Sequence, residues 1–190
     1  MSSLNKFLKD YEREECKYLA EIAALISKND AEVVKAVKFA IDNPKKYLKR
    51  NAERFDDRSI DFSDEDFTDE FEPEELLFLA MVDELDQHGY AFEVDWKCGL
   101  EDFIWSLEQM KPYGLISDVI SHLELDENDD VETWGKTLNA ALEDRARLGY
   151  IDIDSDSYVL IIVTPEVLAK ISKIAEENGH NILDFRQEGI

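Results

Sequence analysis

The 190-residue chain is poor in cysteine, glycine and proline, and each shortage excludes a class of protein. Its two cysteines, Cys16 and Cys98, lie far apart and outside any CxxC motif, which argues against a disulfide framework and against a structural zinc site. Seven glycines and four prolines exclude collagen-like and low-complexity architectures. No run of apolar residues reaches the roughly 18 that a membrane span requires. With 44% hydrophobic residues, the composition instead indicates a globular protein with a core.

Basic residues are also scarce, because 21 lysines and arginines face 45 acidic residues and leave a net charge of −24. Such a surface repels nucleic acid and anionic membranes, whose binding depends on lysine and arginine. We therefore expect no nucleic-acid or membrane partner. The natural partners of such a surface are basic proteins, cations or water alone. The first thirty residues are charged throughout and lack the apolar core of a signal peptide, which predicts a cytoplasmic protein.

The negative charge is unevenly distributed along the chain. Residues 1–58 hold 11 acidic and 13 basic residues, so residues 59–190 hold 34 acidic and 8 basic ones. The junction is an acidic run with interspersed phenylalanines, and its candidate partner-binding residues are Asp56, Asp57, Asp61, Asp64, Glu65, Asp66, Asp69 and Glu70. One interpretation is a solvated linker. The other is a docking strip for a basic partner, or one that folds back on the basic stretch 45–54.

Apolar spacing predicts an all-helical N-terminal region. One long helix is expected over 4–26, a second is expected to begin after Asn29 or Asp30, and a third at Asn43-Pro44. A further helix is expected from Pro73 to the His88-Gly89 pair. The predicted division is a helical region over 1–55, an acidic linker over 56–72 and an α+β domain over 73–190.

The C-terminal region alternates between strand and helix patterns. Strands are predicted over 90–96, as a hairpin over 150–163 with its second strand central in the sheet, and as a short edge strand after 180. Helices are predicted over 100–110, 115–123, 131–148 with Gly149 as its end, and from Thr164-Pro165 to Gly179. Trp105 and Trp134 are assigned to the core. The fold class is α+β, with N-terminal helices followed by a small mixed sheet packed with helices.

The sequence contains no motif that identifies a catalytic or cofactor site. Calcium-loop templates starting at Asp126 or Asp152 fail at the glycine and glutamate positions. Phosphate-binding glycine loops, zinc-protease motifs and nucleophile elbows are absent, and the three histidines lie far apart in the sequence. No cofactor, metal ligand or catalytic residue is predicted.

One cluster is a candidate ligand site, at the end of the first predicted strand and on the neighbouring hairpin. Carboxylates, one lysine and aromatic side chains there suit a small cation, an amine or the arginine of a partner. The candidate residues are Asp95, Trp96, Lys97, Asp154, Asp156 and Tyr158. The alternative is structural: Asp95 faces solvent, Trp96 fills the core, and Lys97 pairs with a surface carboxylate.

Two sequence features carry a resemblance to a known family. They are the Asp95-Trp96-Lys97 strand end and the hairpin Asp154-Ser155-Asp156-Ser157-Tyr158 before the last helix. Residues 73–185 around them resemble a family of uncharacterised bacterial proteins catalogued as a domain of unknown function, and residues 1–58 are expected to lie outside the likeness. The resemblance implies an intracellular bacterial α+β domain, with no established activity.

Three hypotheses for function follow. The first is a non-enzymatic acidic module that binds a basic protein, of which an immunity-protein-like toxin inhibitor is the most concrete form. The second is a small-ligand or divalent-cation-binding protein or enzyme that uses Asp95, Lys97 and the carboxylates of 152–156. The third is a DNA mimic, which requires carboxylates spaced like phosphates.

Overall fold

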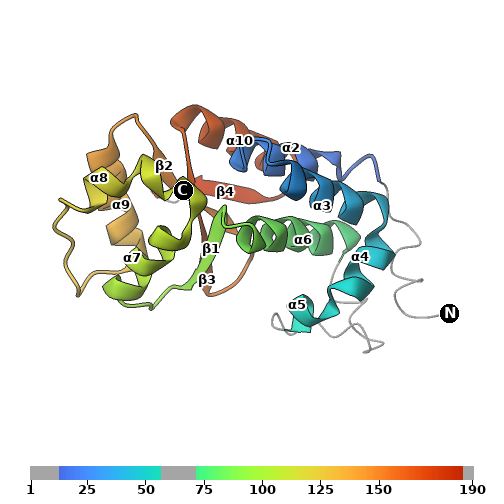
Figure 1. The fold of residues 1–190 in the computed structure, drawn as a ribbon, viewed down its shortest axis with the longest axis horizontal. Coiled ribbons are helices and arrows are strands. Elements are labelled where there is room, and N and C mark those ends of the chain that lie inside the picture. Colours follow the sequence, from blue (N-terminus) through green and yellow to red (C-terminus); the bar gives the residue numbers. More distant parts are fainter. Residues whose placement is uncertain (1–12, 57–71, 186–190) are drawn as a thin grey trace. The chain divides into compact units, whose positions relative to one another are not determined.

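The computed structural model describes residues 13–56 and 72–185 (Figure 1). This part of the chain divides into two compact units. The first takes its residues from Met1–Ala24 and Asn29–Glu84, and the second from Leu25–Lys28 and Leu85–Ile190. The first is helical and the second holds a four-stranded sheet, which confirms the α+β fold class.

The helices of the first unit begin largely where the sequence predicts. The Asp30 side chain accepts a hydrogen bond from the Glu32 N–H and so caps the second helix, and Pro44 occupies the first turn of the third. The prediction of one continuous helix over 4–26 is wrong, because residues 13–16 form a turn. The helices are α2 (Lys17–Ile26), α3 (Ala31–Asp42), α4 (Pro44–Arg50), α5 (Ala52–Asp56) and α6 (Pro73–Gln87), of which α2 and α6 end in the second unit.

A buried polar contact joins α4, α5 and α6 of the first unit. The Tyr47 hydroxyl donates to Glu84 Oε1 at 2.6 Å, and Arg54 donates to the same oxygen at 2.7 Å. Burial and the Glu84 carboxylate raise the pKa of Tyr47, so this hydroxyl keeps its proton and remains a donor. The buried apolar side chains of this unit include Leu19, Ile22, Val33, Val37, Leu48, Phe55, Leu76 and Met81.

The sheet of the second unit has the order β1-β3-β2-β4, with every neighbouring pair antiparallel. The expected mixed sheet is therefore antiparallel instead. The predicted hairpin is confirmed, and its second strand is central because it pairs with strands on both sides. The predicted edge strand after 180 is also confirmed. The strands are β1 (Ala91–Asp95), β2 (Arg147–Asp152), β3 (Ser157–Val163) and β4 (Asn181–Asp184).

Helices cover both faces of this sheet, which explains why every residue of β3 from Val159 to Val163 is buried. On one face Leu160 and Ile162 pack with Phe103 and Trp134 in a single apolar cluster. On the other face α10 lies against β2 and β4. The helices are α7 (Leu100–Gln109), the 3-10 turn η3 (Lys111–Leu115), α8 (Ser117–Ile120), α9 (Val131–Leu142) and α10 (Pro165–Glu177).

The prediction of a helix over 131–148 closed by Gly149 is wrong, because α9 ends at Leu142 and Gly149 lies inside β2. Gly149 is a position where neighbouring elements approach the β2 backbone closely, and it does not end a helix. A Cβ atom at Gly149 would lie 2.9 Å from Leu168 Cδ1 of α10 and 2.9 Å from the Leu183 carbonyl oxygen. No larger side chain fits between β2, β4 and α10 at this position.

A buried asparagine connects α9 to the start of β2. Leu148 opposes Ile162 of β3 in the sheet register, but β4 pairs with β2 only from Gly149 onward. Asn139 supplies the missing partners: its side-chain nitrogen donates to the Leu148 carbonyl at 2.8 Å, and its side-chain oxygen accepts from the Leu148 N–H at 2.8 Å.

The network continues through two charged side chains. Asn139 Nδ2 also donates to Asp184 Oδ1 at 2.9 Å, and Arg147 Nε lies 3.6 Å from Asp184 Oδ2. Arg147 is itself buried and donates to the carbonyl oxygens of Glu143 and Ala146. A buried charge is tolerated where such partners compensate its desolvation.

No helix in the two described stretches is long and apolar enough to cross a membrane. The division into regions 1–55, 56–72 and 73–190 stays a prediction. Within the described residues, α6 as far as Glu84 groups with the helices of the first unit, although the sequence interpretation assigned it to the α+β domain.

The Asn139 contacts lead to a stability prediction. Asn139→Asp removes the donor to Leu148 and places a carboxylate beside Asp184, so we expect the free energy of unfolding to fall by about 2–4 kcal/mol. The control is Asn178→Asp, the same chemical change on an exposed residue after α10, with a loss of about 1 kcal/mol or less. Urea unfolding followed by circular dichroism measures both, and equal losses would contradict this role of Asn139.

Candidate binding surface

The end of β1 and the β2–β3 turn lie side by side, as the sequence interpretation expected. Asp95 opposes Ser157 in the register, and the Trp96 N–H donates to the Asp156 carbonyl at 3.3 Å. This places Asp95, Trp96 and Lys97 beside the turn that contains Asp154 and Asp156.

The Lys97 ammonium lies 4.4 Å from the centre of the Trp96 ring, in a cation–π contact. Asp95 Oδ1 accepts a hydrogen bond from the Lys97 backbone N–H at 2.7 Å, which fixes the turn after the strand. Trp96 is 46% exposed, so the alternative interpretation that it fills the core is wrong.

Polar side chains of the hairpin stabilise its turn. Asp154 adopts a positive φ of 55°, and its N–H donates to Asp152 Oδ1 at 3.0 Å. Ser157 lies 2.8 Å from Ser155 between their hydroxyl oxygens, and it donates to Glu93 Oε1 at 2.6 Å. These contacts explain the aspartates and serines of this segment as turn formers.

The sixth candidate residue lies on the other face of the sheet. Tyr158 opposes Val94, one position from the Asp95–Ser157 pair, so its side chain points toward α7 and α9. Its ring packs against Tyr150 at 5.0 Å and Phe185 at 5.6 Å between centroids. Tyr158 is therefore separated from the cluster to which the sequence interpretation assigned it.

Trp105 of α7 is 53% exposed, and it and Trp96 are the exposed large hydrophobic side chains among the described residues. The assignment of Trp105 to the core is wrong, because α7 turns Phe103 and Leu107 inward and Trp105 is about 200° of helical rotation from Phe103. The Trp105 ring packs edge to face against Phe92, at 5.5 Å between ring centroids. Trp134 is buried as predicted, and its Nε1–H donates to the Asp126 carbonyl at 2.7 Å.

Three carboxylates lie around Trp105 on the surface of α7. Glu101, Asp102 and Glu108 stand four and three positions before it and three positions after it, so they share its face of the helix. All four side chains are exposed, and α7 contains no basic residue. We call Glu101, Asp102, Trp105 and Glu108 the α7 face. The sequence interpretation missed it, although the position of Trp105 off the apolar stripe and between acidic residues was a readable signal.

The predicted partner-binding residues of the acidic run fall mostly outside the described residues. These are Asp57, Asp61, Asp64, Glu65, Asp66, Asp69 and Glu70, whereas Asp56 is the last residue of α5. Within residues 13–56 and 72–185, no three histidine, cysteine, aspartate or glutamate side chains form a group that could hold a metal ion.

Comparison with known proteins identifies a family to which no activity is assigned. A family model described as "Domain of unknown function (DUF6630)" matches residues 19–186. The match extends well before residue 58, so the expectation that residues 1–58 lie outside the likeness is wrong for most of that stretch. No curated protein and no solved structure matches the chain.

The pKa of the half-buried Cys98 thiol depends on the negative charge of the neighbouring α7 face. Burial, followed by the carboxylates of Asp102 and Asp95, raises the pKa of Cys98. Only the thiolate reacts with iodoacetamide, so at pH 8 we expect alkylation of Cys98 to be slower than that of free cysteine, whose pKa is about 8.5. The measurement is the rate against pH in a Cys16→Ala chain.

Two variants distinguish the effect of the nearby carboxylate on the pKa of Cys98 from the effect of burial. Asp102→Asn removes a nearby negative charge and should lower the pKa, which shifts the rate profile to lower pH. Glu132→Gln on α9 is the control and should leave the profile unchanged. Coincident profiles for Asp102→Asn and the parent chain would contradict the assigned influence of this carboxylate.

Proposed function

The chain belongs to the DUF6630 family, and from its surface we propose that it is a non-enzymatic module that binds a basic protein partner through the α7 face. The observation that supports this is a half-exposed tryptophan among three carboxylates on a helix without a basic residue. An inhibitor of a cationic bacterial toxin, acting in the cytoplasm, is the form of the proposal that best suits this chemistry.

Each component of the α7 face matches a property of an arginine-rich or lysine-rich surface. The indole of Trp105 offers an aromatic face to a guanidinium or ammonium group, and tryptophan is enriched among residues that dominate binding energy. Glu101, Asp102 and Glu108 can accept charge-assisted hydrogen bonds from the same groups. Both interactions need only side chains that are already exposed, so the partner can dock without unfolding the helix.

The charge of the whole chain adds long-range attraction. A net charge of −24 steers a cationic partner toward the surface, which raises the association rate, and salt weakens this attraction. The acidic run 56–75 contributes eleven of these carboxylates whatever its conformation. The Trp105 ring then provides the local contact that the diffuse charge lacks.

The cation or small-ligand alternative at Asp95, Lys97 and the hairpin has no contact that favours it. Asp95 and Asp152 accept backbone N–H groups of their own turns, and Lys97 stacks on Trp96. The DNA-mimic hypothesis likewise stays a prediction.

The first test compares two sets of charge-neutralised variants. Tagged chains carry either Glu101→Gln, Asp102→Asn and Glu108→Gln on α7, or Glu166→Gln, Glu176→Gln and Glu177→Gln on α10. The control residues are exposed, and each set removes three negative charges. Each set also includes at least one substitution in the first turn of its helix, α7 or α10. Proteins captured from the native cells are compared over a series of salt concentrations.

We expect a basic protein that the parent and the α10 variant retain at low salt and release at high salt. The α7 variant should lose it, and Trp105→Ala should weaken the purified complex by about 2–4 kcal/mol. Capture that does not change with salt would contradict the electrostatic part of the proposal. Equal loss from both variants would contradict the assignment to the α7 face.

A further inference from the structure

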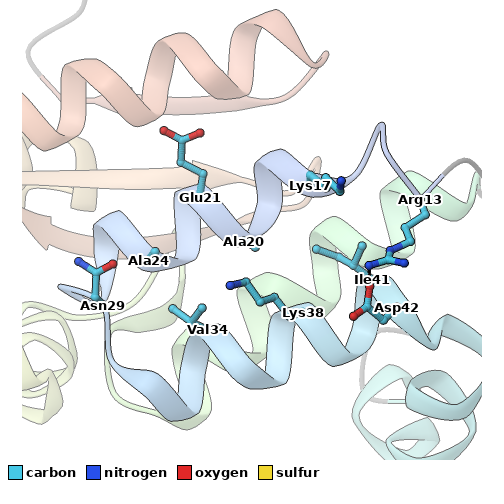
Figure 2. Close-up of a pocket in the computed structure, with 10 residues that line it drawn as sticks. All are labelled: Arg13, Lys17, Ala20, Glu21, Ala24, Asn29, Val34, Lys38, Ile41 and Asp42. Carbon is cyan, nitrogen blue, oxygen red and sulfur yellow. Dashed lines mark ion pairs between the residues drawn. The ribbon is translucent and has the colours of Figure 1, made fainter.

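A groove runs between α2 and α3 in the first unit (Figure 2). Its volume is about 410 Å³, within the range of small-molecule sites. One face of each helix lines it, with Lys17, Ala20, Glu21 and Ala24 from α2 and Val34, Lys38, Ile41 and Asp42 from α3.

The groove is open because small residues stand where the helices face each other. Ala20 and Ala24 extend only a methyl group toward Val34 and Ile41, so the walls are apolar but do not fill the space. Asn29 stands at one end of the groove, and the Arg13–Asp42 ion pair at 2.6 Å closes the other.

Lys38 gives this apolar groove a positive charge. Figure 2 shows its side chain extending from α3 into the space between the helices, whereas Glu21 points away from α3. The other two cations of the lining are paired, Arg13 with Asp42 and Lys17 with Glu14 at 2.5 Å. No carboxylate among the described residues pairs with Lys38, although the chain carries a large excess of acidic groups.

We propose that the α2–α3 groove binds a small amphipathic carboxylate. The apolar body of the ligand lies along Ala20, Ala24, Val34 and Ile41, and its carboxylate pairs with the Lys38 ammonium. Burial of hydrocarbon against these residues supplies affinity, and the lysine selects an anionic head group. This site lies in the first unit and takes an anion, so it is independent of the α7 face, which lies in the second unit and takes a cation.

Three probes with the same hydrocarbon tail test the selection of the head group. Octanoate, octanol and octylamine are titrated into the full chain by isothermal titration calorimetry. The proposal predicts the tightest binding for octanoate, weaker binding for octanol and the weakest for octylamine. Equal binding of all three, or no binding of octanoate at millimolar concentration, would overturn it.

Two variants test the location of the site. Lys38→Met keeps the side-chain length and removes the charge, and it should weaken octanoate by at least about tenfold with little effect on octanol. Lys49→Met is the matched control, an exposed lysine on α4 outside the groove, and should bind octanoate like the parent. Identical affinities in these two variants would overturn the role of Lys38.

A substitution that fills the groove tests whether the hydrocarbon tail of the ligand binds between α2 and α3. Ala24→Leu places a larger side chain against Val34, so it should abolish binding of octanoate and octanol together. Its circular dichroism and midpoint of thermal unfolding are compared with the parent. A folded Ala24→Leu chain that binds octanoate unchanged would overturn the proposal, and Lys38→Met tests it without altering the packing between the helices.

Discussion

The second unit is organised around the hydrogen bonds between Asn139 and the backbone of Leu148. They determine where the chain stops being helix and starts being strand, because they satisfy the backbone groups of β2 that lie beyond the end of β4. Asp184 and Arg147 connect the same asparagine to β4. Once β2 is held in this register, β3 pairs with it and carries β1 on its other side, which places α7.

Glycine completes this arrangement at two positions where the chain packs too closely for a side chain. Phe185, just after β4, lies so near α9 that a Cβ atom at Gly135 would be 2.5 Å from its ring. Gly149 likewise leaves room for Leu168 of α10, which a Cβ atom would approach to 2.9 Å. The polar network and the two glycines therefore fix α9, α10 and β4 relative to β2 within one unit.

Local sequence patterns predicted most elements because their signals are short-range. Asp30 and Thr164 cap helices with their own side chains, Pro44 and Pro165 start them, and the alternation in 90–96 marks β1. The helix predicted over 131–148 extended too far, and the reason for this error is long-range. Residues 142–149 resemble a helix with a terminal glycine, but Leu148 and Gly149 pair with Ile162 and Asp184 of neighbouring strands.

The candidate sites show the same division between local and long-range information. The strand end Asp95-Trp96-Lys97 and the hairpin turn could each be read from a local pattern, and the long-range pairing of β1 with β3 brings them together. Tyr158 was misplaced by one step of the strand alternation, which puts it on the opposite face. Trp105 was assigned to the core as part of an apolar helical face, although its spacing from Phe103 and Leu107 places it outside that face. The α2–α3 groove depends on how two helices face each other, which their separate sequences do not specify.

In the proposed function, Trp105 is the residue that meets a basic partner. Its indole N–H signal can be followed by two-dimensional NMR beside those of Trp96 and Trp134 while a nona-arginine peptide is added. We predict that the Trp105 signal shifts in a saturable, salt-sensitive manner, whereas the signal of Trp134, which is buried and bonded to Asp126, stays in place. A Trp105 signal that does not move, or equal shifts of Trp105 and Trp134, would contradict this role of Trp105.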